Sequence, residues 1–219
     1  MFYYPALKPR AIKAVGSYQV ASPTGSVTTQ TGGAGHDILS FRWASTTLDC
    51  IVWWVKWQFN VITGFTAGQY VQHSLYKARV FSVSPSAATS LIPATGDQKR
   101  HDSMADSALT AFQIATTGDI TIGTRTLEAK PMRTRGLWCP TTTVVQQAED
   151  ITPAQQPYLM LLTSGGAAAN GQGFVLQNDV TMGAAGVIIV NVEVCWSEIK
   201  PDSFYADDST ASSNFYGGT

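Results

Sequence analysis

The stretch IVWWVKWQFNV, residues 51–61, decides the fold class, because its apolar side chains recur at every second position. The odd-numbered positions are all apolar: Ile51, Trp53, Val55, Trp57, Phe59 and Val61. A period of two is that of a β-strand with one buried face. The pattern therefore predicts a long strand with Trp53 and Trp57 in the core. Trp54 falls on the opposite face and is a candidate for contact with a partner.

Other segments share this period and predict further strands. In GVIIVNVEVCWSEI, residues 186–199, one face carries Ile188, Val190, Val192, Val194 and Trp196. In HDILSFRWAS, residues 36–45, Leu39, Phe41 and Trp43 alternate with polar side chains. The short connection TTLDC predicts that this strand forms a hairpin with residues 51–61. A second hairpin is predicted from residues 157–166 and 174–178, around the turn at Asn170 and Gly171.

The composition limits the kinds of partner. The 219 residues have a net charge of −1, and only 13% of them are charged. Nucleic acids and anionic membranes attract a basic surface, so neither is an expected partner. No run of about 18 apolar residues is present to span a bilayer, and the opening MFYYPALKPRAIK lacks the features of a signal peptide. The expected partners are proteins.

The chain is predicted to be one domain, residues 1–219, because sandwiches of this size commonly stay undivided. The fold class is mainly β, an antiparallel β-sandwich or jelly roll, with an N-terminal arm of about residues 1–20 and a C-terminal tail of about residues 201–219. One short helix is predicted at about residues 101–113. There the apolar residues have helical spacing, and Asp102 or Ser103 is a suitable N-cap.

No pattern in the chain predicts catalysis or metal binding. The three histidines, His36, His73 and His101, lack the spacing of metal ligands, and the three cysteines indicate buried free thiols. No nucleophile elbow, phosphate loop or dinucleotide-binding motif is present. Scattered carboxylates, Glu128, Glu193 and Glu198 among them, are the only basis for a hydrolase. We expect no enzyme activity, cofactor, metal or small-molecule substrate.

The terminal segments supply further candidates for partner contact. Aromatic residues near the start are mixed with basic ones, a composition suited to an arm that docks on a neighbouring protein. Two more aromatic residues lie near the end of the tail. With Trp54, the interface candidates are Phe2, Tyr3, Tyr4, Lys8, Arg10, Phe215 and Tyr216.

Several segments together resemble a group of tailed-bacteriophage virion proteins. They are ILSFRWASTT, GFTAGQY followed by KARVFS, GDITIGTRTLEAKPM and GFVLQNDVTMGAAGVIIVNVEVCWSEI, and they span roughly residues 36–199. The resemblance consists of strand and turn patterns and includes no catalytic signature. The N-terminal arm and the tail lie outside it.

The resemblance implies a structural protein of the virion, assembled in the host cytoplasm. It implies a homotrimer that binds the outer capsid surface as a decoration or cement protein. The implied partners are the major capsid protein and copies of the chain itself. An alternative is a tail or fibre component that binds a host receptor or glycan, with an exposed Trp54 stacked on a sugar ring.

Overall fold

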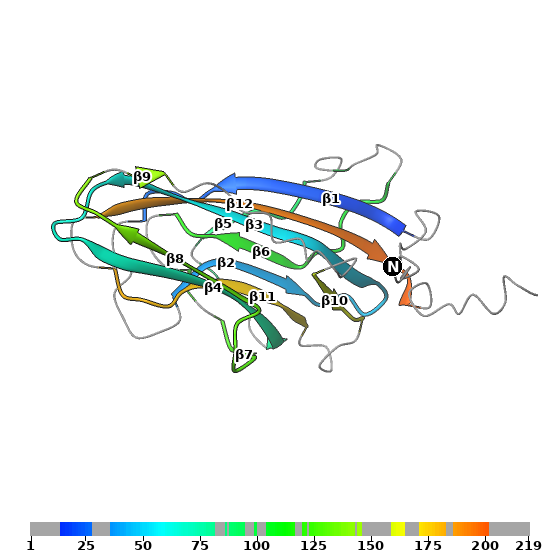
Figure 1. Ribbon diagram of the computed structural model, residues 1–219. Coiled ribbons are helices and arrows are strands. Elements are labelled where there is room, and N and C mark those ends of the chain that lie inside the picture. Colours follow the sequence, from blue (N-terminus) through cyan, green and yellow to red (C-terminus); the bar gives the residue numbers. More distant parts are fainter. Residues whose placement is uncertain are drawn as a thin grey trace, which may run out of the picture.

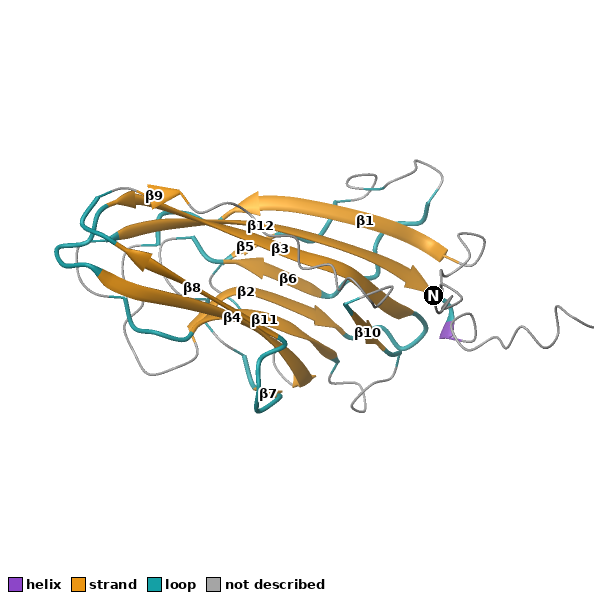
Figure 2. Ribbon diagram, in the orientation of Figure 1, coloured by secondary structure: helices purple, strands orange, loops and turns teal. Residues whose placement is uncertain are grey.

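The computed structural model describes residues 14–27, 36–81, 86, 88–94, 99, 104–116, 120–121, 123–142, 144–145, 159–164, 171–182 and 186–201. Strands make up most of these residues (Figure 2). They are β1 (Ala14–Pro23), β2 (His36–Trp43), β3 (Asp49–Thr63), β4 (Gln69–Phe81), β5 (Thr89–Ser90), β6 (Ala111–Ile114), β7 (Arg125–Leu127), β8 (Arg133–Cys139), β9 (Val144–Val145), β10 (Met160–Leu162), β11 (Gln172–Asn178) and β12 (Val187–Ile199).

The strands form two antiparallel sheets whose long strands run along the length of the molecule (Figure 1). Within the described residues, sheet A has the order β1-β12-β3-β10, with β9 also paired to β3. Sheet B has the order β5-β6-β2-β11-β4-β7, with β8 also paired to β4. Strands from the two halves of the chain therefore alternate throughout sheet A, and in sheet B β11 lies between β2 and β4.

This order is that of a jelly roll. The pairs β1·β12, β2·β11, β3·β10 and β4·β8 are those of one long hairpin of the whole chain. Rolling that hairpin up creates the pairs β12·β3 and β11·β4, which close the two sheets. Eight antiparallel strands in two facing sheets define a jelly roll. The predicted fold class is confirmed.

Neither predicted hairpin forms. After β2 the chain leaves sheet B and enters sheet A with β3, and β10 and β11 likewise belong to different sheets. A short connection between two alternating strands is equally compatible with a hairpin and with a crossing between layers. In a jelly roll the crossing is favoured, because it lets the two strands face each other across the core.

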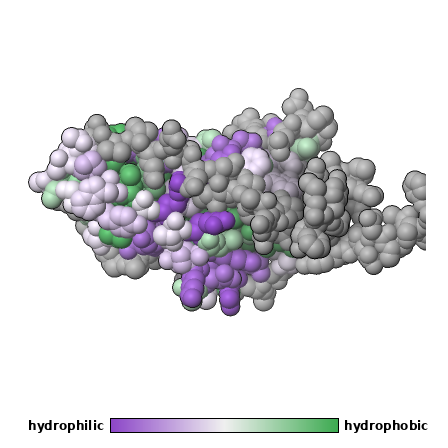
Figure 3. Space-filling view, viewed as in Figure 1, coloured by the Kyte–Doolittle hydropathy of each residue, from purple (hydrophilic) through white to green (hydrophobic). Residues whose placement is uncertain are grey.

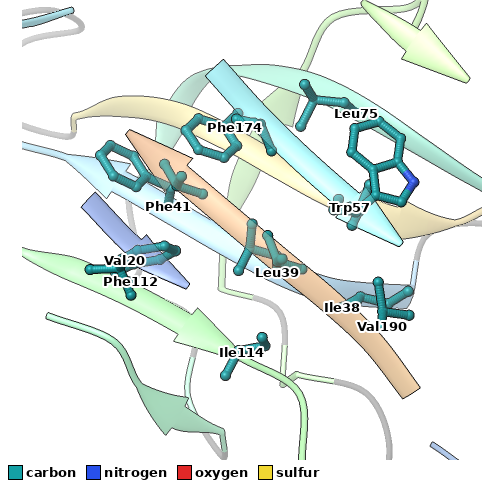
Figure 4. Packing of buried hydrophobic residues seen from close by; sticks show 14 of the residues in the cluster. Val20, Ile38, Leu39, Phe41, Trp57, Leu75, Phe112, Ile114, Phe174 and Val190 are labelled. Carbon is teal, nitrogen blue, oxygen red and sulfur yellow. The ribbon is translucent and has the colours of Figure 1, made fainter. Parts of the chain in front are cut away.

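The core lies between the sheets, and side chains from both layers meet there (Figure 4). Phe41 of β2 packs edge-to-face on Trp196 of β12, with ring centres 5.6 Å apart. Tyr18 of β1 stacks on the same indole at 5.3 Å. Burial of each such side chain contributes roughly 1.5–3 kcal/mol. The whole predicted apolar face of residues 186–199, from Ile188 to Trp196, belongs to this core.

The predicted helix at about residues 101–113 is wrong for the part that the structure describes. Residues 105–110 form neither a helix nor a strand, and β6 begins at Ala111. Leu109 and Phe112 still enter the core, Leu109 from this irregular segment and Phe112 from β6, which pairs with β2. The pairing with β2 supplies backbone hydrogen bonds that a helix would otherwise make internally, so tertiary contacts override the local preference. No described segment is a helix long and apolar enough to cross a membrane.

The predicted arm and tail lie mostly outside the described residues. Residues 14–20, which the sequence places in the arm, belong to β1 at the edge of sheet A. The candidates Phe2, Tyr3, Tyr4, Lys8, Arg10, Phe215 and Tyr216 all lie outside the described residues.

Candidate functional site

A β-bulge in β3 sets the position of the two adjacent tryptophans. In the pairing with β12, Cys195 lies opposite Trp54 and Trp196 lies opposite Val52, so Trp53 is the extra residue. Along β3 the residues that face the core are therefore even-numbered before the bulge and odd-numbered after it. Val52 and Val55 both belong to the core cluster although they are three positions apart. A bulge of this kind inserts one residue and turns the following side chains to the other face.

The bulge corrects the prediction for Trp53. Its indole is half-buried and outside the core cluster, whereas Trp57, Phe59 and Val61 are core residues as predicted. Ile51 is fully buried but also lies outside that cluster. The sequence of residues 51–61 gives no sign of the bulge. Trp53 and Trp54 are both apolar, so the regular alternation continues through the inserted residue.

Both indoles donate hydrogen bonds to side chains of β12, which fix them on the outer face of sheet A. Trp53 Nε1 donates to Ser197 Oγ at 2.8 Å, and Trp54 Nε1 donates to Glu193 Oε1 at 2.9 Å. Gln19 Nε2 of β1 donates to the same Glu193 oxygen at 3.0 Å. The indoles therefore lie across strand β12 in set orientations, tied to all three long strands of sheet A.

Lys56 completes the cluster around Trp54. Its Nζ atom lies 5.1 Å from the centre of the Trp54 ring, a cation–π distance. The same atom is 3.9 Å from Glu193 Oε1, and both side chains of this ion pair are about 30% exposed or less. An ion pair at the surface contributes at most about 1 kcal/mol. Its main effect is to place a cation over the indole, which leaves Trp54 poorly suited to stack on a sugar.

A buried thiol, that of Cys195, lies between Glu193 and Ser197, the two residues of β12 to which the indoles donate. Cys195 pairs with Gln19 on one side and Trp54 on the other, and its side chain is fully buried although it belongs to neither hydrophobic cluster. On the outer face of the sheet, only neighbouring side chains can shield it from solvent. The tryptophans of the bulge are the large side chains at that position.

A groove runs beside this cluster across β1, β12 and β3. Its volume is about 310 Å³. It follows two adjacent rows of paired residues, the first formed by Ala21, Glu193 and Lys56, the second by Pro23, Asn191 and Gln58. The small Ala21 side chain lies at its β1 end. We call this groove together with Trp53, Trp54 and Ser197 the sheet A face.

The three carboxylates considered for hydrolysis are held apart. Glu193 binds Trp54 on the outer face, whereas Glu198 is fully buried at the end of the core, where burial raises its pKa. Glu128 follows β7 and pairs with Arg79 at 3.4 Å. Each carboxylate has its own structural partner, and together they form no site.

The described part of the chain contains no group of three His, Cys, Asp or Glu side chains arranged to hold a metal ion. His73 is buried against Phe59, with ring centres 4.2 Å apart, and burial lowers its pKa to about 3. His101 lies outside the described residues. Cys50, Cys139 and Cys195 are free and buried, which confirms the interpretation of the thiols.

A second surface feature was missed by the sequence reasoning. Tyr70 and Trp138 are 45% and 61% exposed, and they lie directly opposite each other in β4 and β8. No strand is predicted from the sequence for residues 133–139, whereas Arg133–Cys139 form strand β8. The signal that indicates this strand is weak. Leu137 packs against the core and Cys139 lies within it, and Gly136 interrupts the alternation.

Comparison with known proteins identifies no family. No family model matches the sequence, and no curated protein matches it. Among solved structures, the 60-mer BFDV capsid protein is 9% identical, with 84% of this chain and 92% of that chain covered and a TM-score of 0.25. The VP2 subviral particle of infectious bursal disease virus is 12% identical, with 91% and 48% covered and a TM-score of 0.18. With TM-scores this low, the fold assignment rests on the strand pairing alone.

Proposed function

We propose that this chain is a non-enzymatic structural protein of a virus particle. It binds the outer surface of a bacteriophage capsid as a homotrimeric decoration protein, and its partners are the major capsid protein and further copies of itself. The virion is its location, with assembly in the host cytoplasm. The similarity of residues 36–199 to phage virion proteins supports this role. A jelly roll is compatible with it, since viral capsid domains use this fold.

The observation that carries the proposal is the sheet A face. Protein interfaces are enriched in aromatic residues with a polar handle, and binding is stronger when these residues are already ordered. Trp53 and Trp54 meet both conditions, because hydrogen bonds to Ser197 and Glu193 orient them before any partner arrives. The adjacent groove offers a concave surface for a side chain of the partner.

The trimer is proposed from the position of β1. This strand is an edge of sheet A, next to the groove. Lys99 and Ala105 contact the first half of that edge at Tyr18 and Val15, so the proposed contact between copies uses its second half, residues 19–23. An exposed edge strand is open to pairing with another chain, and closed assemblies protect such edges. In a three-fold ring each copy would meet the next through the β1 edge, leaving the sheet A face for the shell.

Stabilisation of the shell then follows from mass action. A protein that binds assembled subunits, and not dissociated ones, shifts the equilibrium toward the assembled state. Three linked copies bind several sites at once, so the second and third contacts form at a high effective concentration.

Co-sedimentation with particles that lack the protein tests this role. The wild-type chain is expected to sediment with them at about micromolar concentration, and Trp54→Ala is expected to bind more weakly. Ile92→Ala is the matched control, because Ile92 is an exposed apolar residue remote in sequence from the sheet A face. Absence of binding by the wild type would overturn the proposal. Light scattering of the free protein tests the trimer separately.

The alternative role, glycan recognition by a tail or fibre component, is favoured by a different surface. Trp54 is partly covered by Lys56, whereas Tyr70 and Trp138 are open to solvent. The surface of Tyr70 and Trp138 is available to a glycan whether the protein lies on the capsid or on the tail of the particle.

A further inference from the structure

The exposed pair Tyr70–Trp138 lies on the outer face of sheet B. Tyr70 of β4 and Trp138 of β8 are direct partners in the antiparallel register. Side chains opposite each other in this way start only about 5 Å apart and lie on one face. On the other face of the same strands, Val71 and Cys139 point into the core. The two aromatic side chains therefore project from neighbouring positions on the same exposed face.

Glycines give this surface its form. A Cβ atom at Gly136 would overlap the phenol ring of Tyr70, and one at Gly68 would come within 2.9 Å of Trp138 Cζ2. Both aromatic side chains thus rest against backbone that carries no side chain. Covering a glycine in this way holds an aromatic ring close to the sheet. It leaves the other side of each ring available to a ligand.

A row of fixed polar groups continues from the rings along β4. Asp179 accepts hydrogen bonds from Gln72 Nε2 at 3.1 Å, from Ser74 Oγ, and from the Tyr76 hydroxyl at 3.4 Å. Ser74 Oγ also lies 2.8 Å from Thr134 Oγ1 of β8. Gln72 is paired with Gly136, directly beside the ring of Tyr70. Amide, hydroxyl and carboxylate groups are thus pre-ordered next to the aromatic surface.

This combination is suited to a sugar. A pyranose presents an apolar face of C–H groups and a rim of hydroxyls, so it needs an aromatic surface and adjacent hydrogen-bonding groups. A protein partner needs about 800 Å² on each side, mostly apolar at its centre. Two rings flanked by polar residues do not provide that. On the side of the molecule shown in Figure 3, hydrophobic residues appear in separate patches, and hydrophilic ones gather around β7.

We infer that the outer face of β4 and β8 is a carbohydrate-binding site. An extended oligosaccharide lies along β4, because the row of Ser74 and Thr134 lies about 13 Å along the strand from the two rings. Sugar rings stack on Trp138 and Tyr70, and the hydroxyls of the sugars that follow bond to Gln72, Thr134 and Asp179. The site is far from the groove of the sheet A face in the fold, because it belongs to the other sheet. Binding of saccharide and binding to the shell are therefore separable.

The test begins with the full chain on an array of bacterial surface oligosaccharides and simple hexoses, followed by calorimetric titration of the saccharides retained. Trp138→Ala is expected to weaken binding at least about tenfold, and Tyr70→Ala to weaken it to a smaller extent. Trp138→Phe keeps a ring and is expected to retain most of the affinity.

Matched controls keep the test decisive. Ile62→Ala removes an exposed apolar side chain that is 44% exposed, and Trp54→Ala alters the sheet A face; neither is expected to change the affinity. Near-ultraviolet circular dichroism establishes that each variant is folded. If the Trp138→Ala protein still co-sediments with particles but no longer binds saccharide, this site is separate from the proposed decoration role.

Three results would overturn the inference. The wild type retains no saccharide on the array, or Trp138→Ala binds as tightly as the wild type. The third is a self-association of the wild type that Trp138→Ala abolishes without any saccharide binding, which makes the pair a contact between copies.

Discussion

The carboxylate of Glu198 accepts hydrogen bonds from the backbone nitrogen of Ala108, at 3.1 Å to one oxygen and 3.0 Å to the other. The Ser107 hydroxyl donates to the same carboxylate at 2.6 Å, and the Trp196 indole at 3.3 Å. Glu198 thus holds residues 107–108 against the end of β12. Its carboxylate accepts the hydrogen bond that Ala108 N–H would donate to the carbonyl of the preceding turn in the predicted helix.

Glu198→Ala is therefore expected to destabilise the protein. It leaves one buried donor, the Trp196 indole, and two partly buried ones, Ser107 and Ala108, without their acceptor, and each buried loss costs roughly 1–3 kcal/mol before relaxation. We expect the free energy of unfolding to fall by about 2–4 kcal/mol in a urea titration. Glu193→Ala, on the solvent side of the same strand, is the control and should cost less than about 1 kcal/mol. Equal losses would show that Glu198 does not anchor the segment.

Burial of His73 makes stability depend on pH. Its pKa is lowered to about 3 in the folded protein, from 6.5 when unfolded. Below pH 6.5 the unfolded chain takes up a proton that the folded chain refuses, so stability falls as the pH drops toward 3. The slope reaches at most about 1.4 kcal/mol per pH unit.

Urea titrations at pH 7.5, 5.5 and 4.5 measure this dependence. The difference between the wild type and His73→Leu isolates it from the raised pKa of Glu198, which acts in the opposite direction. The variant should lose less stability on acidification than the wild type. Parallel curves for His73→Leu and wild type would contradict the assignment.

The ion pair between Asp37 and Arg125 joins β2 to β7 at 2.8 Å, with both side chains almost completely buried. Arg125→Met leaves a buried carboxylate without its counter-charge, which costs about 3–5 kcal/mol. The exposed pair of Arg79 with Glu128 offers the comparison, and Arg79→Met should cost less than about 1 kcal/mol. Thermal and urea unfolding of the two variants test this. Adding Asp37→Asn to Arg125→Met should recover part of the loss.

Gly136→Val tests whether the Tyr70 ring must rest on the backbone of Gly136 for the site to bind saccharide. The new side chain would occupy the space of the phenol ring, which has to swing away into solvent. Because Tyr70 is exposed, the expected change in unfolding free energy is small, below about 1 kcal/mol. Saccharide affinity should nevertheless fall at least about threefold, since the Tyr70 ring is no longer held in place for stacking. Unchanged affinity would place the ligand away from Tyr70.

The thiol of Cys195 reports on the tryptophans of the bulge. In the native protein it should react with a thiol reagent only on unfolding, because it is fully buried. Trp54→Ala should open it, and the labelled residue is identified by mass spectrometry of peptides. Cys50 and Cys139 serve as internal controls that stay protected. Protection of Cys195 in the variant would mean that Trp54 does not cover it.

Much of the architecture is predictable from single segments. The period of two in residues 51–61 and 186–199 identifies β3 and β12, and the assignment of Trp57 and Trp196 to the core needs no other information. The parity of Trp54 likewise puts it on the outer face, where it contacts Glu193. These inferences hold because a strand alternates its side chains whatever it pairs with.

Features that depend on a second strand are different. Trp53 leaves the core because β12 pairs with β3 across a bulge. The predicted helix does not form because Glu198 accepts hydrogen bonds from residues 107–108 and β2 pairs with residues 111–114. Tyr70 and Trp138 become neighbours only through the pairing of β4 with β8.

The sequence by itself thus determined the class of the fold, the identity of its long strands and most of its core. Tertiary structure alone decided which strands pair, where the register shifts, and which aromatic side chains meet at the surface. The physical reason is that alternation is a local property of one strand, whereas pairing is a competition among all strands for the same core. Alternation can therefore be recognised in the sequence of a single segment, whereas the pairing is decided only when all the strands have assembled into the two sheets.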